Sequence, residues 1–259
     1  MYATNFYEAA VLNLMRGVTM EAPADMYVAL FLSDPGETGE AGTEVTYSGY
    51  ARQKIEFSAP AATDGGGIGV SNIADITFPI TPVAIGTITH LAVCDSLTGG
   101  NKYLYGEFTE SLHVQANEAP VIVAGEAQWW WQGNMSNAYK TKTLNVLRGT
   151  SCLGCYPHLA LYDGLPESGG SELSGLGYSR PALTFSAPEE QVGGQMQIAN
   201  SLAASTARAA AAWGAWDYTV IMDANTSGQP VWYAQRTPKL MRKGLLASVA
   251  VGALRVTVN

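Results

Sequence analysis

The sequence predicts a mainly β protein: two tandem modules, each an antiparallel β-sandwich or small barrel preceded by a short N-terminal α-helix. Three observations carry this prediction. The two halves of the 259-residue chain resemble each other, each half begins with one helical pattern, and short β-rich segments with Gly-, Pro- and Ser-rich connections follow. We place module 1 at residues 1–132 and module 2 at residues 133–259.

The two halves of the chain repeat the same motifs in the same order. Residues 49–60 read GYARQKIEFSAP and residues 177–188 read GYSRPALTFSAP, so seven of twelve positions are shared. Further along, residues 90–108 align without gaps with residues 218–236. Because ordered matches at a nearly constant offset indicate duplication, we predict two copies of one unit, joined near residues 132–135.

Each module begins with one short helix. Residues 5–16 place apolar side chains at helical spacing between Thr4, a candidate N-cap, and Gly17, and residues 136–149 repeat this plan. Strand patterns follow at residues 26–32, 51–57, 86–94, 102–108 and 121–131, and module 2 closes with a similar run at residues 247–258. Two interpretations of residues 202–212 stay open, because their Ala content favours a helix whereas their alignment with residues 74–84 favours an extended segment.

The composition argues against several classes of partner. The 22 acidic residues outnumber 14 basic ones, giving a net charge of −8, and the one short basic cluster is residues 239–243, so we expect no nucleic-acid partner. No window holds the roughly 18 uninterrupted apolar residues of a membrane helix, so we expect no membrane partner. The first residues lack the basic start and apolar run of a secretory signal, which predicts synthesis in a cytoplasm.

Two motifs imitate metal sites. Cys152, Cys155 and His158 have a spacing that zinc ligands can share, but no second pair completes a set of four. Asp223 opens the stretch DANTSG, which resembles the first half of an EF-hand loop, yet its twelfth position is Ala234 and not Glu. We favour structural roles for both motifs, with DANTSG as a hairpin turn, and expect neither metal nor cofactor.

No residue stands out as a catalytic acid, base or nucleophile. The chain has 3 histidines and no G-x-S-x-G motif. His90 and His158 align with Tyr218 and Tyr27, which indicates strand positions that accept any large ring. A carboxylate pair for glycoside hydrolysis leaves no mark in a sequence, because such acids meet in space. We predict that the protein is not an enzyme.

Two features remain as candidate sites. Trp129, Trp130 and Trp131 are consecutive, so on a strand the outer two point to one face and Trp130 to the other. We favour an interface role, sealing module 1 against module 2 or a neighbouring subunit, over a platform on which sugar rings stack. Arg52 and Arg180 each follow a Gly-Tyr pair, and we interpret both as structural arginines that bind a loop carboxylate or carbonyls of their own module.

Module 1 also carries an ordered set of motifs that resembles a known family. The motifs are YVALF with SDPGETG and TEV, then GYARQ with FSAP, then DITFP, GTITH and TGGN before LYG. This pattern resembles the small virion proteins of tailed bacteriophages that are commonly labelled phage tail fiber protein. The resemblance covers residues 5 to about 125, while module 2 is similar only through module 1.

The resemblance implies a structural protein on the exterior of a phage particle, made in the host cytoplasm. We interpret the chain first as an outer capsid decoration or cement protein that stabilises the shell, because a duplicated module can bridge two neighbouring sites on a lattice. The alternative is a tail fibre or tail-tip adhesin that contacts the host surface. The expected partners of this chain are the major capsid protein or other virion proteins, and copies of itself.

Overall fold

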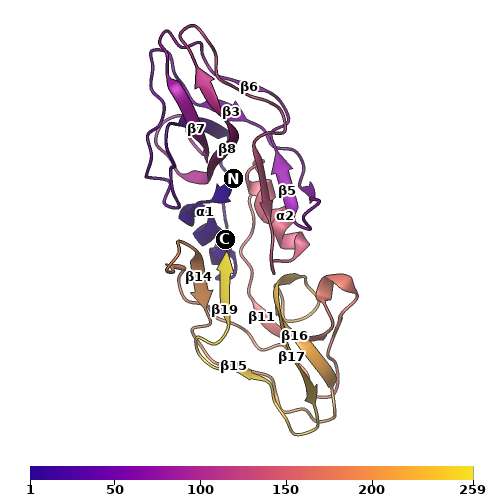
Figure 1. The fold of residues 1–259 in the computed structure, drawn as a ribbon. Helices are drawn as coiled ribbons and strands as arrows, with labels where there is room; N and C mark the ends of the chain where they lie inside the picture. The colour runs from indigo at the N-terminus through magenta and orange to yellow at the C-terminus, as the bar shows by residue number, and fades with distance from the viewer. Residues whose placement is uncertain (259) are drawn as a thin grey trace.

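The computed structural model describes residues 1–258 and confirms a mainly β fold with two short helices (Figure 1). Its strands form several small antiparallel sheets, and none of them closes into a barrel within the described residues. The arrangement of elements in module 1 is repeated in module 2. No helix among the described residues is long and apolar enough to cross a membrane.

Module 1 contains one large sheet and two small ones. The large sheet has the strand order β1-β8-β7-β2-β3, a three-stranded sheet has the order β10-β5-β4, and β6 pairs with β9. The bounds are β1 Tyr2–Ala3, β2 Met26–Phe31, β3 Gln53–Ile55, β4 Ala61–Ala62, β5 Ile68–Ser71, β6 Ile76–Thr77, β7 Gly86–Cys94, β8 Lys102–Val114, β9 Val121–Ile122 and β10 Gln128–Trp131.

Module 2 repeats this arrangement. Its large sheet has the order β12-β11-β16-β17, its three-stranded sheet the order β13-β14-β19, and β15 pairs with β18. The bounds are β11 His158–Asp163, the 3-10 helix η1 Pro166–Ser168, β12 Ser171–Glu172, β13 Glu189–Glu190, β14 Met196–Ala199, β15 Ala204–Ser205, β16 Gly214–Met222, β17 Pro230–Met241, β18 Ser248–Val249 and β19 Arg255–Val258.

The helices α1 (Asn5–Leu14) and α2 (Asn137–Val146) begin at equivalent caps. The Thr4 side chain accepts a hydrogen bond from the backbone N–H of Tyr7, and Ser136 does the same for Tyr139. Each cap hydroxyl also donates to a carbonyl at the start of the long hairpin strand of its own module, Lys102 for Thr4 and Pro230 for Ser136, at 2.5 Å in both cases. The caps therefore fix where each helix leaves its own large sheet.

Each helix then packs against the three-stranded sheet of the other module. Helix α1 contacts β14 and β19, and α2 contacts β5. In Figure 1 the two helices and the two small sheets form the middle of an elongated molecule, with the large sheets of the two modules at opposite ends. One continuous buried cluster includes residues of both helices and both small sheets. The two modules thus share one core.

A pair of equivalent residues joins the modules beyond the helices. Met20 and Cys152, which follow α1 and α2 at the same distance, form an isolated antiparallel bridge, with N–H to carbonyl distances of 2.8 and 2.9 Å. Gly154 lies against the backbone of Gly17, where a Cβ atom would collide with the Gly17 carbonyl. The bridge pairs a residue with its own copy, so it marks the centre of the pseudo-twofold arrangement.

Several predicted boundaries change in the structure. The expected closing run of module 1 divides into β9 and β10, and that of module 2 into β18 and β19, because a turn separates each pair. Residues 202–212 contain no helix; Ala204 and Ser205 form β15, which pairs with β18, and the rest is irregular. Partner strands here supply the hydrogen bonds that an Ala-rich segment would otherwise make within a helix.

Candidate functional site

The three consecutive tryptophans lie on β10, which pairs with β5. Trp129 and Trp131 are buried, with 4% and 1% of their surface exposed, whereas Trp130 is 39% exposed. The rings of Trp129 and Trp131 meet edge to face at 5.1 Å between centroids, and the ring of Trp131 lies 5.5 Å from that of Tyr7 on α1. The Tyr7 hydroxyl donates to the carbonyl of Thr143 on α2 at 2.9 Å. The inner indoles therefore belong to the core where both helices meet.

Trp130 lies on the opposite face of this sheet. Below it, β5 carries Gly69, and a Cβ atom there would come within 2.9 Å of the Trp130 Cβ. At Gly67, just before β5, a Cβ atom would lie 3.3 Å from the Trp130 Cδ1 and would collide with the Trp131 carbonyl oxygen. Ala61, Ala62 and Gly69 also line a shallow hollow of about 220 Å³ next to Trp130. The arrangement presents one indole over a smooth backbone surface, which is a geometry that planar ligands can stack on.

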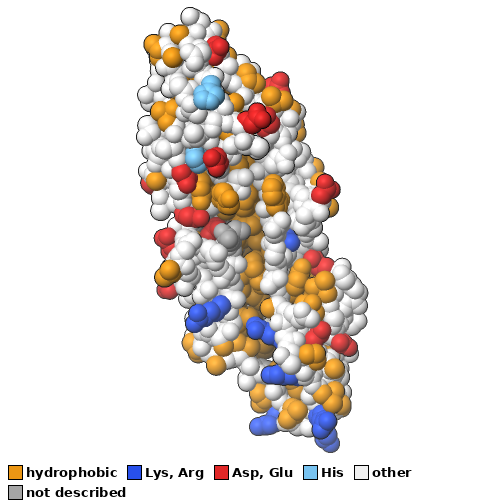
Figure 2. Space-filling view, in the orientation of Figure 1, with side chains coloured by type: hydrophobic (Ala, Val, Ile, Leu, Met, Phe, Trp, Pro, Cys, Tyr) orange, Lys and Arg blue, Asp and Glu red, His pale blue; other side chains and the backbone are white. Residues whose placement is uncertain are grey.

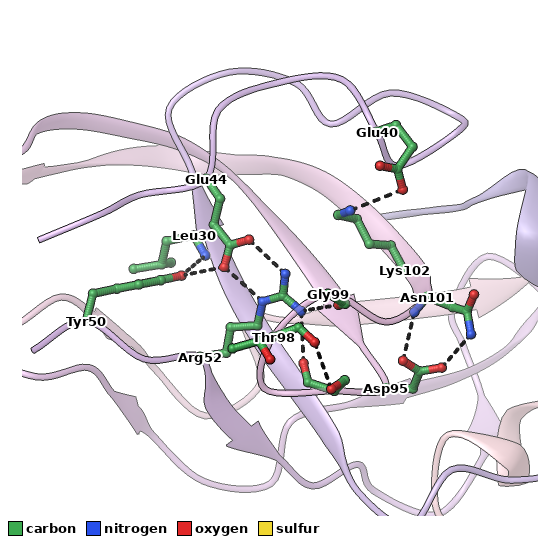
Figure 3. Close-up of polar contacts among 11 residues, drawn as sticks. Leu30, Glu40, Glu44, Tyr50, Arg52, Asp95, Thr98, Gly99, Asn101 and Lys102 are labelled. Carbon is green, nitrogen blue, oxygen red and sulfur yellow. Dashed lines mark hydrogen bonds and ion pairs between the residues drawn. The ribbon is translucent and has the colours of Figure 1, made fainter.

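Arg52 holds three segments of module 1 together (Figure 3). Its Nε and Nη2 donate to the two carboxylate oxygens of Glu44, both at 2.8 Å, while Nη1 donates to the carbonyls of Ser96 and Gly99 at 2.9 and 2.7 Å. The Tyr50 hydroxyl contacts the same carboxylate at 3.3 Å and accepts from the backbone N–H of β2 at Leu30. The Arg52 side chain is only 6% exposed and that of Glu44 is 26% exposed, so the bidentate pair is partly shielded from water on its guanidinium side.

Module 2 repeats the same contacts. Arg180 donates from Nε and Nη2 to Glu172 at 2.7 and 2.5 Å, and from Nη1 to the carbonyls of Ala224 and Ser227 at 2.8 and 2.6 Å. The Tyr178 hydroxyl donates to Glu172 at 2.8 Å and accepts from a backbone N–H of β11. Hydrogen bonds to the carboxylates raise the pKa of both arginines. Each guanidinium thus makes four hydrogen bonds, two to a carboxylate and two to turn carbonyls, and these contacts tie the hairpin turn to the large sheet.

The hairpin turns that these arginines bind are also stabilised by hydrogen bonds within each turn. Asp95 accepts from the backbone N–H of Asn101 at 2.8 Å, and Asp223 accepts from that of Gln229 at 2.7 Å. Gly228 has φ +73°, and a Cβ atom there would collide with the Asp223 carboxylate. The DANTSG stretch is therefore a hairpin turn between β16 and β17.

The cysteine motif is part of the junction between the modules. Cys152 forms the central bridge with Met20, and the Cys155 N–H donates to the carbonyl of Leu14 at 2.8 Å. Both thiols are buried, and burial raises the pKa of Cys155 to about 11, which keeps the free thiol protonated at neutral pH. The described residues contain no group of three His, Cys, Asp or Glu side chains that could hold a metal ion.

A buried carboxyl group, which the sequence did not single out, lies between α1 and module 2. Glu8 is 1% exposed, and its Oε2 accepts from the Met196 N–H of β14 at 2.9 Å. Burial, the largest cause, raises the pKa of Glu8 to about 8, and the nearby Glu37 adds to the rise. The equivalent residue on α2 is Lys140, whose Nζ donates to the Gly133 carbonyl at 3.1 Å and whose pKa is lowered by burial. The two helix positions thus carry opposite charge types.

Charge is divided unequally between the modules, which the total for the chain conceals. Module 1 has 4 Lys and Arg against 15 Asp and Glu, a net charge of −11, while module 2 has 10 against 7, a net charge of +3. Figure 2 shows this difference on one face: basic side chains gather mainly over the lower half, whereas acidic ones lie over the upper half and also at a few places below it. This difference in net charge can be read from the sequence when charged residues are counted separately for each half.

Comparison with known families assigns the chain to one of them. The sequence model described as Podophage GP4 fiber I protein gp80 matches residues 2–129 and again residues 134–257. The chain belongs to this family. The double match also confirms the tandem duplication, and the family resemblance seen in the motifs of module 1 extends to module 2. A search of curated proteins gives no significant match. The family is a phage fibre family, so the protein is a structural component of a phage virion.

Proposed function

We propose that the protein is a rigid unit of a podophage fibre on the outside of the virion, without catalytic activity. The observation that carries the proposal is the exchange of helices, α1 onto β14 and β19 and α2 onto β5. Two independent domains on a linker would bend freely, whereas a shared core holds both modules in one elongated body. An appendage that projects from a particle and bears load needs such a joint.

The exchanged helices make the two modules depend on each other. We propose residues 1–132 and 133–259 as the units of duplication, and not as domains that fold alone. The Tyr7 to Thr143 and Glu8 to Met196 hydrogen bonds cross the boundary, and both are buried. Splitting the chain at residue 132 would expose these groups together with the apolar surface around them.

Capsid decoration, the function that the sequence first suggested, is the competing proposal. In that role one chain would bridge two neighbouring lattice sites with two equivalent modules. Equivalent sites require equivalent surfaces, and net charges of −11 and +3 make the two modules dissimilar partners. The family description and this difference both support a fibre over a shell protein.

Quantitative mass spectrometry of separated phage heads and tails tests this proposal. Copies of the chain are expressed per copy of the major capsid protein in each fraction. We expect a small number of copies in the fibre-bearing fraction. A head fraction in which the chain approaches a simple ratio to the capsid protein would contradict the fibre proposal and support decoration. Immunogold labelling of intact particles gives an independent location.

A second candidate role, binding of host glycans, concerns Trp130 alone. Its exposed indole over Gly67 and Gly69 favours stacking of a sugar ring, whereas the buried Trp129 and Trp131 serve the core. Binding of the purified protein to an array of host-surface glycans, compared with Trp130→Ala, tests the role. Loss of a glycan signal in Trp130→Ala supports it, and absence of binding to every glycan argues against it. Tyr156→Ala on module 2, which removes an exposed aromatic ring, is the control.

A further inference from the structure

Module 1 has a wide groove beside the far end of its long hairpin, which we call the acidic groove. It has a volume of about 870 Å³ and is lined by the second half of β8 and by segments around β9 and β10. Four carboxylates are exposed along it, those of Glu107, Glu110, Glu118 and Glu126. Two of them, Glu118 and Glu126, accept hydrogen bonds from nearby backbone N–H groups, while Glu107 and Glu110 make no hydrogen bond or ion pair with described residues. Their charge faces solvent.

Module 2 has a groove at the equivalent place, which we call the basic groove. Two adjoining hollows of about 240 and 350 Å³ lie between β16, the second half of β17 and the β18 region. Arg236 and Lys239 line it, and both are exposed. The Lys239 ammonium lies 6.0 Å above the Trp216 ring, and Leu240 and Leu245 are about half exposed nearby, at 51% and 49%. This groove combines positive charge with apolar surface that lacks a cover.

The strand registers show that the two grooves are copies of one surface. In module 1 Ile88 lies opposite Leu112, and in module 2 the corresponding pair is Trp216 opposite Lys239. A lysine thus replaces a leucine at one position of the duplicated surface. His113 is the only imidazole that lines the acidic groove among the described residues, and its Nδ1 is engaged with Thr87 at 3.0 Å. After duplication the same surface carries opposite charge in the two modules.

We propose that the partner of these grooves is a second copy of this chain, with the acidic groove of one copy against the basic groove of the other. Charge complementarity selects this occupant, because each groove finds its counter-charge on the same polypeptide. On the face in Figure 2 acidic side chains gather over module 1 and basic ones over module 2. A half turn of the second copy sets acid against base at both ends, so a closed dimer satisfies both grooves at once.

The net charge of −8 does not prevent this pairing. At about 0.1 M salt the screening length is about 10 Å, so the groove charges that meet at the interface outweigh charges elsewhere on the chain. The exposed leucines of the basic groove and the apolar stems that line both grooves would be covered in the dimer, which adds a hydrophobic contribution to the pairing. This pairing involves only two copies of the chain, so it does not depend on where the chain lies in the virion.

Sedimentation velocity of the purified full-length protein at about 0.1 M and about 1 M salt tests the proposal, since the screening length falls from about 10 to 3 Å. We expect dimers at low salt and monomers at high salt. Glu107→Lys with Glu110→Lys gives one variant, and Arg236→Glu with Lys239→Glu gives the other. Each should weaken self-association about ten-fold or more at low salt, because like charges then face each other. An equal mixture of the two variants should restore dimers, since each supplies the charge that the other needs.

Glu189→Lys with Glu190→Lys is the matched control for the Glu107→Lys and Glu110→Lys variant, because it makes the same change in net charge at exposed positions outside both grooves. This control should associate as the unaltered protein does. A protein that stays monomeric at low salt overturns the proposal, and so do reversal variants that still dimerise or that fail to pair when mixed. A monomer that instead binds heparin, an anionic polysaccharide, through Arg236 and Lys239 overturns it as well and assigns the basic groove to a glycan.

Discussion

Glu8→Gln should change how the stability of the protein depends on pH. Glu8 is buried between α1 and β14, and its pKa is about 8 in the folded protein, against an ordinary value of 4.5. Between these two pH values the folded chain holds a proton that the unfolded chain has released. The free energy of unfolding therefore falls as the pH rises through this range, and the fall ends above pH 8.

The size of the effect follows from the two pKa values. Each pH unit between them lowers the free energy of unfolding by slightly more than about 1 kcal/mol. Between pH 4.5 and pH 7 this carboxyl group alone lowers it by about 3 kcal/mol. Glutamine has nearly the same shape and does not ionise, so Glu8→Gln should lack this contribution. The difference in free energy of unfolding, variant minus wild type, should grow by about 3 kcal/mol over the same range.

Urea unfolding followed by tryptophan fluorescence, at several pH values from 4.5 to 8.5, measures the difference. Glu189→Gln on β13 is the control, because it removes an ionisable carboxyl group at an exposed position. The absolute stability of Glu8→Gln is not the readout, because the new amide N–H groups also require partners. A difference between Glu8→Gln and wild type that stays constant with pH would refute the reasoning.

Three further substitutions test the core, the clamp and the second helix. Trp131→Ala should destabilise the protein by about 3–5 kcal/mol in urea unfolding, whereas Trp130→Ala should stay within about 0.5 kcal/mol; equal losses would contradict the assignment of faces. Arg52→Met should cost about 2–4 kcal/mol because it leaves the Glu44 carboxylate without its bidentate partner, and the double variant with Glu44→Gln should recover part of that loss. Lys140→Met should raise the free energy of unfolding above that of wild type, most at neutral pH and less as the pH rises toward 10.5. Burial lowers the pKa of Lys140, so the folded wild-type chain binds fewer protons than the unfolded chain in this range and becomes more stable as the pH rises. A difference in free energy of unfolding that does not change with pH would contradict a lowered pKa.

Patterns within one segment predicted the elements of the fold well. Helical spacing with Thr4 and Ser136 as caps located both helices, and the repeated Gly-Tyr-x-Arg motif marked positions that the structure fills with matching contacts. The alternation of side chains on a strand anticipated that Trp130 faces away from Trp129 and Trp131. Whether those three residues form an interface or a glycan site stays a prediction.

The features that the sequence did not reveal depend on long-range packing. Helical spacing identifies an apolar face but not the sheet that covers it, so the exchange of α1 and α2 left no local mark. Glu8 looked like an ordinary first-turn carboxylate, although its counterpart Lys140 showed that the two helix positions had diverged. Residues 202–212 form no helix: Ala204 and Ser205 pair with β18, and this tertiary contact overrides the helix preference of alanine.

The exchange of helices also sets the order in which the protein can mature on the ribosome. Helix α1 is among the first segments to emerge, yet Met196, which donates to Glu8, follows it by 188 residues. At a synthesis rate of about 5–20 residues per second, roughly 10 to 40 s pass between the synthesis of α1 and that of β14, the strand that packs on it. During that time the nascent module 1 carries an unprotected apolar helix face in a crowded host cell. Productive assembly of the fibre protein therefore depends on completing the second half of each chain before neighbouring nascent chains meet.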